Sequence, residues 1–173
     1  NTFMTTGPLV FLRADGHVPG EEITIGAGGA TVEVEVEVRS HVPFHRVEFV
    51  WNGKVMASHE DTAGRREFVL TEKIHVDTPG WIAARCSSRF GPTTAWNLGI
   101  QAHTSPVYFK VAGQELFSPA GAAYMLTLIE GAETWARNLA TRPDPESLAR
   151  VLKTFHDARE HLHQRLHAHG IKH

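Results

Sequence analysis

Residues 31–38 read TVEVEVEV, and this stretch decides the fold class of the first two thirds of the chain. Successive side chains of a strand point to opposite faces, so the four valines share one face and the three glutamates share the other. A strand with one apolar and one charged face buries a single side, as antiparallel sheets allow and fully covered parallel sheets do not. The stretch therefore predicts an antiparallel sheet with one face against a core and the other in water.

Further segments with strand character surround this one, and turn residues separate them. Asn52-Gly53 is a typical two-residue turn of a β-hairpin, and it joins two such segments. The predicted strands cover residues 8–14, 31–38, 45–51, 54–58, 66–76, 81–86 and 106–111. About seven or eight short strands at this spacing are typical of an immunoglobulin-like antiparallel β-sandwich. A small barrel is the competing fold, and we expect residues 87–102 to form a long loop.

After Gly113 the apolar residues change to a helical period. Ser118-Pro119 and Asp144-Pro145 each place a capping residue before a proline, which is a typical helix start. The first helix carries an apolar stripe of Ala122, Met125, Leu126, Ile129, Ala132, Ala136 and Leu139. The second carries a heptad-like seam of Leu148, Val151, Leu152, Phe155, Leu162 and Leu166, which Arg159 interrupts. We expect a sandwich domain over residues 1–112 and a hairpin of two antiparallel helices over 113–173.

The first helix also has a second apolar stripe, formed by Tyr124, Leu128 and Trp135. A helix that is apolar on two sides needs two neighbours. The second neighbour is either the sandwich, which is the simpler expectation, or a domain outside this chain. In the latter case the stripe is a docking face.

The composition excludes several classes of protein. Hydrophobic residues make up 42% and charged residues 21%, which is typical of a folded globular chain. The formal net charge is -2 and there is no long basic block, so we expect no nucleic-acid partner. No apolar run approaches the roughly 20 residues that span a bilayer. The single cysteine, Cys86, cannot form an internal disulfide and is expected to be a core thiol rather than a nucleophile.

Histidine is abundant near the end of the chain. On a helix, His163 and His167 would lie one turn apart and could together bind a transition metal. The sequence offers no evident third ligand, so a polar helix face that happens to use histidine is the favoured interpretation. A protein that binds metal through these two residues remains a third hypothesis for the function.

Other candidate groups have simpler structural explanations. Glu33, Glu35 and Glu37 stand about 7 Å apart along a strand, too far to hold one cation together, so we expect them to pair across strands with Arg or Lys. Three tryptophans could stack on sugar rings if they shared an exposed face, although core positions are the default: Trp51, Trp81 and Trp96.

His103 lies in the stretch QAHTSPVY, residues 101–108, just after the predicted loop. Junctions between loops and strands are common places for functional sites on sandwiches. A lone histidine without a partner more often makes a structural hydrogen bond than it catalyses a reaction. We therefore expect a structural role here, with an active-site role as the alternative.

Several segments taken together resemble a known arrangement. Residues 1–9 (NTFMTTGPL) are similar to the TFVTNGPL junction that follows the metal-binding domain of CehA/McbA-family metallohydrolases. These enzymes are similar to the polymerase-and-histidinol-phosphatase (PHP) superfamily of metal-dependent phosphoesterases. The resemblance continues at residues 47–55 (VEFVWNGKV), 80–86 (GWIAARC), 102–108 (AHTSPVY), 118–124 (SPAGAAY) and 142–145 (RPDP).

The resemblance implies that the metal ligands lie in an amino-terminal domain that precedes this chain. The chain begins Asn1-Thr2-Phe3 without an initiator methionine, and we expect it to be a segment cut from a longer protein or a processed product. It would then be a non-catalytic accessory domain that needs no cofactor of its own and supports or covers the parent's metal-dependent hydrolase domain. Arg85 and His103 are our candidates for groups that approach the parent's active site.

A carbohydrate- or polymer-binding module is the alternative function, since sandwiches attached to hydrolases commonly have that role. The cellular compartment is unknown, and a signal peptide upstream would place the protein in the periplasm or outside the cell.

Overall fold

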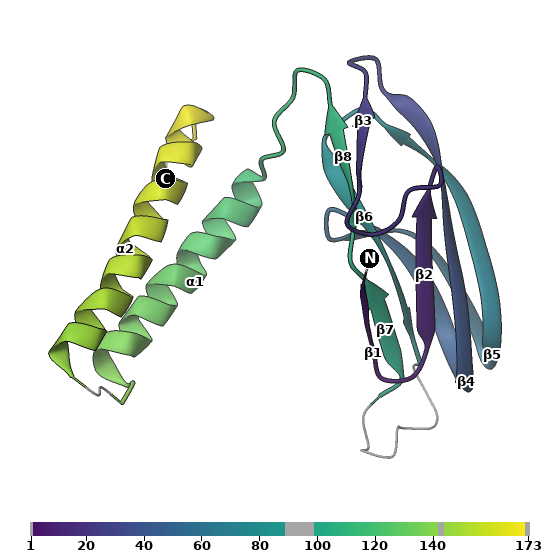
Figure 1. The fold of residues 1–173 in the computed structure, drawn as a ribbon, viewed down its shortest axis with the longest axis horizontal. Coiled ribbons are helices and arrows are strands. Elements are labelled where there is room, and N and C mark those ends of the chain that lie inside the picture. Colours follow the sequence, from purple (N-terminus) through teal and green to yellow (C-terminus); the bar gives the residue numbers. More distant parts are fainter. Residues whose placement is uncertain (1, 89–98, 142–143, 172–173) are drawn as a thin grey trace. The chain divides into compact units, whose positions relative to one another are not determined.

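A computed structural model describes residues 2–88, 99–141 and 144–171 (Figure 1). The chain forms two compact units, Asn1–Leu116 and Phe117–His173, and each is described by itself. The first unit consists of strands and the second of two helices. The strands are β1 (Phe3–Thr5), β2 (Leu9–Ala14), β3 (Glu22–Ile25), β4 (Ala30–Trp51), β5 (Lys54–Val76), β6 (Gly80–Ser87), β7 (Gln101–Thr104) and β8 (Val107–Val111).

The long strands β4 and β5 organise the first unit. They form one antiparallel hairpin that runs from the pair Ala30 and Val76 to the pair Trp51 and Lys54, on either side of the Asn52-Gly53 turn. The first half of β4 pairs with β2 on its other edge, whereas the second half pairs with β6. Register shifts between Arg39 and Arg46 bend β4 between these two neighbours.

This exchange of neighbours creates two layers. The first layer contains β2 with the first half of β4 and the second half of β5. The second contains the remaining halves of β4 and β5, followed by β6, which pairs with both β7 and β8. Strand β1 extends this layer by pairing with β7 in antiparallel fashion. Strand β3 extends it on the other side by pairing with β8 in parallel fashion. The predicted immunoglobulin-like β-sandwich is confirmed.

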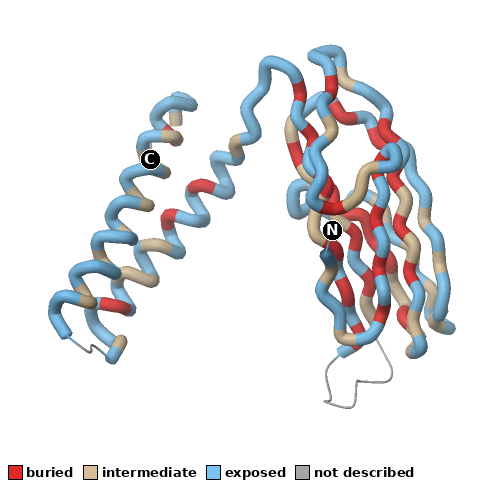
Figure 2. Tube along the Cα trace, viewed as in Figure 1, coloured by how far each residue is buried: buried red, intermediate tan, exposed pale blue. Residues whose placement is uncertain are grey.

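The core lies between the layers, as the alternation in residues 31–38 predicts. The four valines of that stretch are fully buried, and the glutamates between them are exposed or partly exposed. Apolar side chains of the second layer, including Phe49, Ile82 and Phe109, belong to the same buried cluster. Figure 2 shows the result as buried and exposed positions that alternate along the strands.

The strand boundaries differ from the prediction in two ways. The segments 31–38 and 45–51 belong to one continuous strand, as do 54–58 and 66–76, because the β4–β5 pairing continues through the bend. Strands β1, β3 and β7 were not predicted, because three or four residues are too few to display a period. The predicted loop over residues 87–102 is wrong at its ends, because Ser87 still belongs to β6 and residues 101–102 begin β7, which pairs with β6. Its middle, residues 89–98, lies outside the described residues.

The second unit is a helical hairpin of α1 (Pro119–Asn138) and α2 (Pro145–Ala168). Both predicted starts are confirmed: the Ser118 side chain accepts a hydrogen bond from the Gly121 amide, and the Asp144 side chain accepts one from the Ser147 amide. Neither helix is long and apolar enough to cross a membrane.

The core of the hairpin is smaller than the sequence predicts. Its buried cluster consists of Ala122, Leu126 and Leu166, with Phe117, Leu162 and Ile171 partly buried around them, and Ala136 is buried as well. Met125 and Leu139, assigned to the inner stripe, are 46% and 76% exposed, because they lie beside the narrow line of contact.

An ion pair accounts for the interruption of the predicted seam. Glu133 lies on the inner side of α1, and its Oε2 is 3.5 Å from Nη1 of Arg159 on α2. Arg137 donates a hydrogen bond to the other carboxylate oxygen. This hydrogen bond, with the charges of both arginines, lowers the pKa of Glu133.

Candidate functional site

Arg85 and His103, the two residues singled out in the sequence, face each other across β6 and β7. Arg85 is also directly opposite Glu48 of β4, and His103 is directly opposite Met4 of β1. The four side chains thus form one row across four strands. Their neighbours along each strand, such as Cys86, point into the core, so the row lies on the outer face of the second layer.

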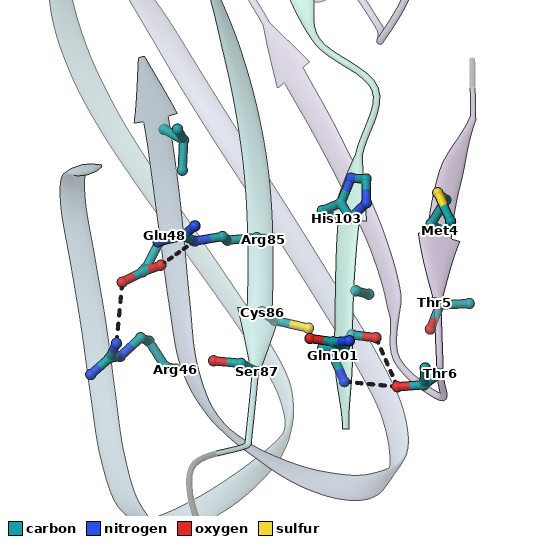
Figure 3. A pocket seen from close by; sticks show the side chains of 12 residues that line it. Met4, Thr5, Thr6, Arg46, Glu48, Arg85, Cys86, Ser87, Gln101 and His103 are labelled. Atoms are coloured by element: carbon teal, nitrogen blue, oxygen red, sulfur yellow. Dashed lines mark hydrogen bonds and ion pairs between the residues drawn. The ribbon is translucent and has the colours of Figure 1, made fainter. Parts of the chain in front are cut away.

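Glu48 is the unusual member of this row, since it is 5% exposed although it lies on the outer face. Arg85 Nε donates a hydrogen bond to its Oε2 over 2.5 Å. On the other side, Nη1 of Arg46 is 3.6 Å from its Oε1, and Arg46 forms a further ion pair with Glu60. Figure 3 shows the Glu48 carboxylate between the two guanidinium groups. A buried carboxylate requires such compensation, and the pairing fixes the direction of both arginine side chains.

The row forms part of a hollow of about 650 Å³. Its lining residues are Met4, Thr5, Thr6, Arg46, Glu48, Val50, Arg85, Cys86, Ser87, Gln101, Ala102 and His103. The lining carries two guanidinium groups and one carboxylate, and the Glu60 carboxylate pairs with Arg46 beside it, so the half-exposed guanidinium group of Arg85 is the donor that stays accessible. The hollow is therefore suited to a small polar or anionic group.

His103 is held loosely. Its Nδ1 lies 3.4 Å from the Thr104 carbonyl oxygen, which is long for a hydrogen bond, and the residue is exposed. The expected structural hydrogen bond is therefore weak, and the imidazole is accessible from the hollow.

Sequence reasoning missed Arg46 and Glu48. A signal was present, because a glutamate inside the apolar run VEFV, two residues after an arginine, shares a strand face with that arginine. Their meeting with Arg85 depends on the β4–β6 register, which a single sequence does not show.

Cys86 lies behind this row and is confirmed as a core thiol. The residue is 2% exposed, and burial raises the pKa of its thiol to about 12. A thiol with this pKa is almost entirely protonated at neutral pH, which disfavours a role as nucleophile.

No protein-family model and no curated protein matches the chain. Among solved structures, it is similar to fibronectin(III)-like modules of CbhA from Clostridium thermocellum, with 19% identity over 57% of this chain and 94% of that one and a TM-score of 0.37. It is also similar to the CARDB domain of PF1109 from Pyrococcus furiosus, with 16% identity over 60% of this chain and 95% of that one and a TM-score of 0.39. The likeness is one of fold. It assigns no ligand or activity.

The tryptophans of the sandwich do not share an open face within the described residues. Trp51 packs against the core, with its ring centroid 5.3 Å from that of Phe109. Trp81 points outward, is partly buried and lies directly opposite Tyr108 of β8. Trp96 lies outside the described residues.

Two of the three strand glutamates lie opposite a basic residue on a neighbouring strand, as the sequence predicts. Glu35 is directly opposite Arg13 of β2, and Glu33 is directly opposite Lys73 of β5. Glu37 forms its ion pair with Arg39 of the same strand. This outer face carries charges of both signs.

His163 and His167 lie one turn apart on α2, as predicted, with their ring centroids 6.5 Å apart. Within residues 2–88, 99–141 and 144–171, no cluster of three or more His, Cys, Asp or Glu side chains is arranged to hold a metal ion. The structure therefore adds no third ligand to this pair from the described residues.

Tyr124, Leu128 and Trp135 lie together on the side of α1 that faces away from Ala122, Leu126 and Ala136. They are 64%, 46% and 58% exposed. Trp135 also lines a hollow of about 460 Å³ at the closed end of the hairpin, whose other apolar lining residues are Ala136, Leu139, Ala140, Leu148 and Val151.

Proposed function

We propose that this chain is a non-catalytic accessory domain that docks, through α1, on a metal-dependent hydrolase domain of the PHP-like class in the same protein. The similarity of six segments to CehA/McbA-family metallohydrolases supports the choice of partner. In that family the divalent metal ions belong to the hydrolase domain. The sandwich would then carry the hairpin and hold it against its partner.

The observation that carries the proposal is the exposure of Tyr124, Leu128 and Trp135 on one face of α1. Exposed large apolar side chains that adjoin one another are typical of interaction sites. Tyrosine and tryptophan are also the residues most enriched among those that dominate binding energy. We therefore assign these three residues to the contact with the hydrolase domain.

The small core of the hairpin supports the same conclusion. The buried residues of the described helices are the cluster of Ala122, Leu126 and Leu166, together with Ala136. A core of this size contributes little to stability, so a further neighbour would stabilise the hairpin by burying apolar area at about 25 cal/mol per Å².

Binding between separately purified proteins tests this function. The hydrolase domain from the same gene is titrated with this chain in a calorimeter, using wild type and the double variant Leu128→Glu, Trp135→Glu. We expect wild type to bind and the variant to bind at least about tenfold more weakly, since it places two charges in an apolar contact.

Met56→Glu is the matched control, because Met56 is 48% exposed on β5 and lies outside the docking face. This control should bind like wild type. Equal binding by the double variant and wild type would contradict the proposal, and so would a gene that encodes no metal-dependent hydrolase domain beside this chain.

Carbohydrate binding is the second candidate function, and one observation favours it. Trp81 and Tyr108 are cross-strand partners on the outer face of the second layer, and two adjacent aromatic rings can stack on a sugar. A glycan array with wild type and Trp81→Ala tests this function. Binding that requires Trp81 would support it, and absence of binding by wild type would contradict it.

A further inference from the structure

We propose that the hollow beside Arg85 and His103 is a binding site for a small molecule that carries an oxyanion group, either a carboxylate or a phosphate. This site lies on the sandwich and does not depend on the docking face of α1, so the two proposals can fail separately.

Arg85 is the main recognition residue. Its Nε is occupied by Glu48, and within the described part of the chain no other acceptor contacts its guanidinium group. The side chain is nevertheless 51% exposed. The terminal amino groups are thus held in a fixed direction and accessible, and a guanidinium fork of this kind suits the two oxygens of a carboxylate or phosphate.

Glu48 acts as a positioning residue. Its buried carboxylate holds Arg85 on one side and Arg46 on the other, so little rotamer freedom is lost when a ligand binds. The Nε of Arg46 is itself buried and has no hydrogen-bond partner among the described residues. This N–H is out of reach of a ligand in the hollow, and the Nη groups of Arg46 are shared between Glu48 and Glu60, so Arg85 is the accessible donor of the pair.

The remaining lining fits an oxyanion as well. The exposed His103 ring and the Ser87 hydroxyl also line the hollow, and each can donate a hydrogen bond. The volume of about 650 Å³ lies within the range of sites for small molecules. These properties point to a small anionic ligand rather than to a protein surface.

The simpler explanation is that Arg46, Glu48 and Arg85 form a structural ion-pair network. A purely structural network would stabilise the fold without making Arg85 a site of saturable binding. The two explanations therefore differ in a direct binding measurement.

Amide proton–nitrogen correlation spectra provide this measurement. The chain at about pH 7 is titrated with inorganic phosphate in one series and with sodium glucuronate in another, at constant ionic strength. We expect saturable shifts at the amides of Arg85, Ser87 and His103 in at least one series, and the series with the tighter binding distinguishes the two sources of the oxyanion.

Two variants identify the site, and one serves as control. Arg85→Gln removes the guanidinium group and should weaken binding at least about tenfold. His103→Gln should weaken ligand binding less than Arg85→Gln does. This second variant keeps the test valid if Arg85→Gln does not fold. Arg13→Gln is the matched control, because Arg13 is an exposed strand arginine on the outer face of the other layer.

The control should bind like wild type. The proposal is overturned if neither ligand gives saturable shifts. It is also overturned if Arg13→Gln weakens binding as much as Arg85→Gln, or if both Arg85→Gln and His103→Gln bind like wild type.

Discussion

Glu48 and Arg85 are direct partners across β4 and β6, and a buried carboxylate thereby meets a half-exposed guanidinium group at 2.5 Å. Such a pair couples the two strands and also determines where Arg85 points. The exposed end of Arg85 reduces the energy of the pair through solvent screening, whereas the burial of Glu48 makes its carboxylate dependent on partners.

A double-mutant cycle measures this coupling. Glu48→Gln and Arg85→Gln should each destabilise the sandwich, and the coupling between them should be about 1 kcal/mol, at the lower end of the range for contacting residues because Arg85 is half exposed. Urea unfolding of the four proteins gives the value. Additive effects of the two substitutions would show that the pair contributes no interaction of its own.

Gly80 is expected to tolerate no side chain. A Cβ at this position would lie 2.5 Å from a ring carbon of Trp51 and within 2.9 Å of the Asn52 side chain, which accepts a hydrogen bond from the Trp81 amide. Because the Trp51 ring packs on Phe109, it cannot move freely, and Gly80→Ala should destabilise the fold by about 1–3 kcal/mol.

Gly28→Ala is the control for that substitution, since nothing lies within 4 Å of a Cβ at Gly28. Thermal unfolding should show a clear loss for Gly80→Ala and little change for Gly28→Ala. Equal stability of the two variants would contradict the packing around Trp51.

Cys86 should make the sandwich less stable at alkaline pH. Burial raises the pKa of its thiol from near 9 to about 12. Between these two values the unfolded chain has lost the proton and the native chain has kept it, so stability falls as the pH rises. At about pH 10 the loss is about 1.4 kcal/mol.

Cys86→Ala isolates this contribution from other groups that titrate at high pH. The free energy of unfolding is measured near neutral pH and at about pH 10 for wild type and variant. The variant should lose less stability over this interval, whatever its stability near neutral pH. Identical losses would show that the thiol ionises freely in the native protein.

Asp144 should make the start of α2 sensitive to acid. Its pKa is lowered, chiefly by the hydrogen bond from the Ser147 amide. A lowered pKa means that this contribution to stability is present above the ordinary value of about 3.9 and is lost as the pH falls through the lower native value. Far-ultraviolet circular dichroism should therefore show a loss of helix on acidification.

Asp144→Asn should retain the cap and reduce this dependence on pH, because an amide oxygen accepts the same hydrogen bond without titrating. Asp157→Asn is the control, since Asp157 lies within α2 and pairs with Lys153 instead of capping. If Asp157→Asn removed as much of the acid response as Asp144→Asn, the cap would not be its source.

Much of the fold could be predicted from local patterns. Local patterns of a few adjacent residues were enough for the alternation in residues 31–38 and for the Asn52-Gly53 turn. They were also enough for the two helix starts, where a capping residue precedes a proline. The path of β4 from one layer to the other could not be predicted in this way, because it depends on which strands lie on either side. The parallel pairing of β3 with β8 depends on strand order for the same reason.

The candidate site was predictable in part. Arg85 and His103 could be proposed from their segments, but their cross-strand contact and the buried Glu48 follow from the registers of β4, β6 and β7. On the hairpin, the face with Trp135 followed from helical spacing. The exposure of Met125 did not, because a stripe of apolar residues does not define how wide the contact between two helices is.

We propose that this chain supports a metal-dependent hydrolase without performing the hydrolysis. The most direct test measures the metal content and the turnover of bis-(p-nitrophenyl) phosphate for residues 1–173 and for the product of the whole gene, side by side. We expect substoichiometric metal and no turnover for residues 1–173, and bound metal with turnover for the whole product. Stoichiometric metal together with turnover by residues 1–173 alone would contradict it.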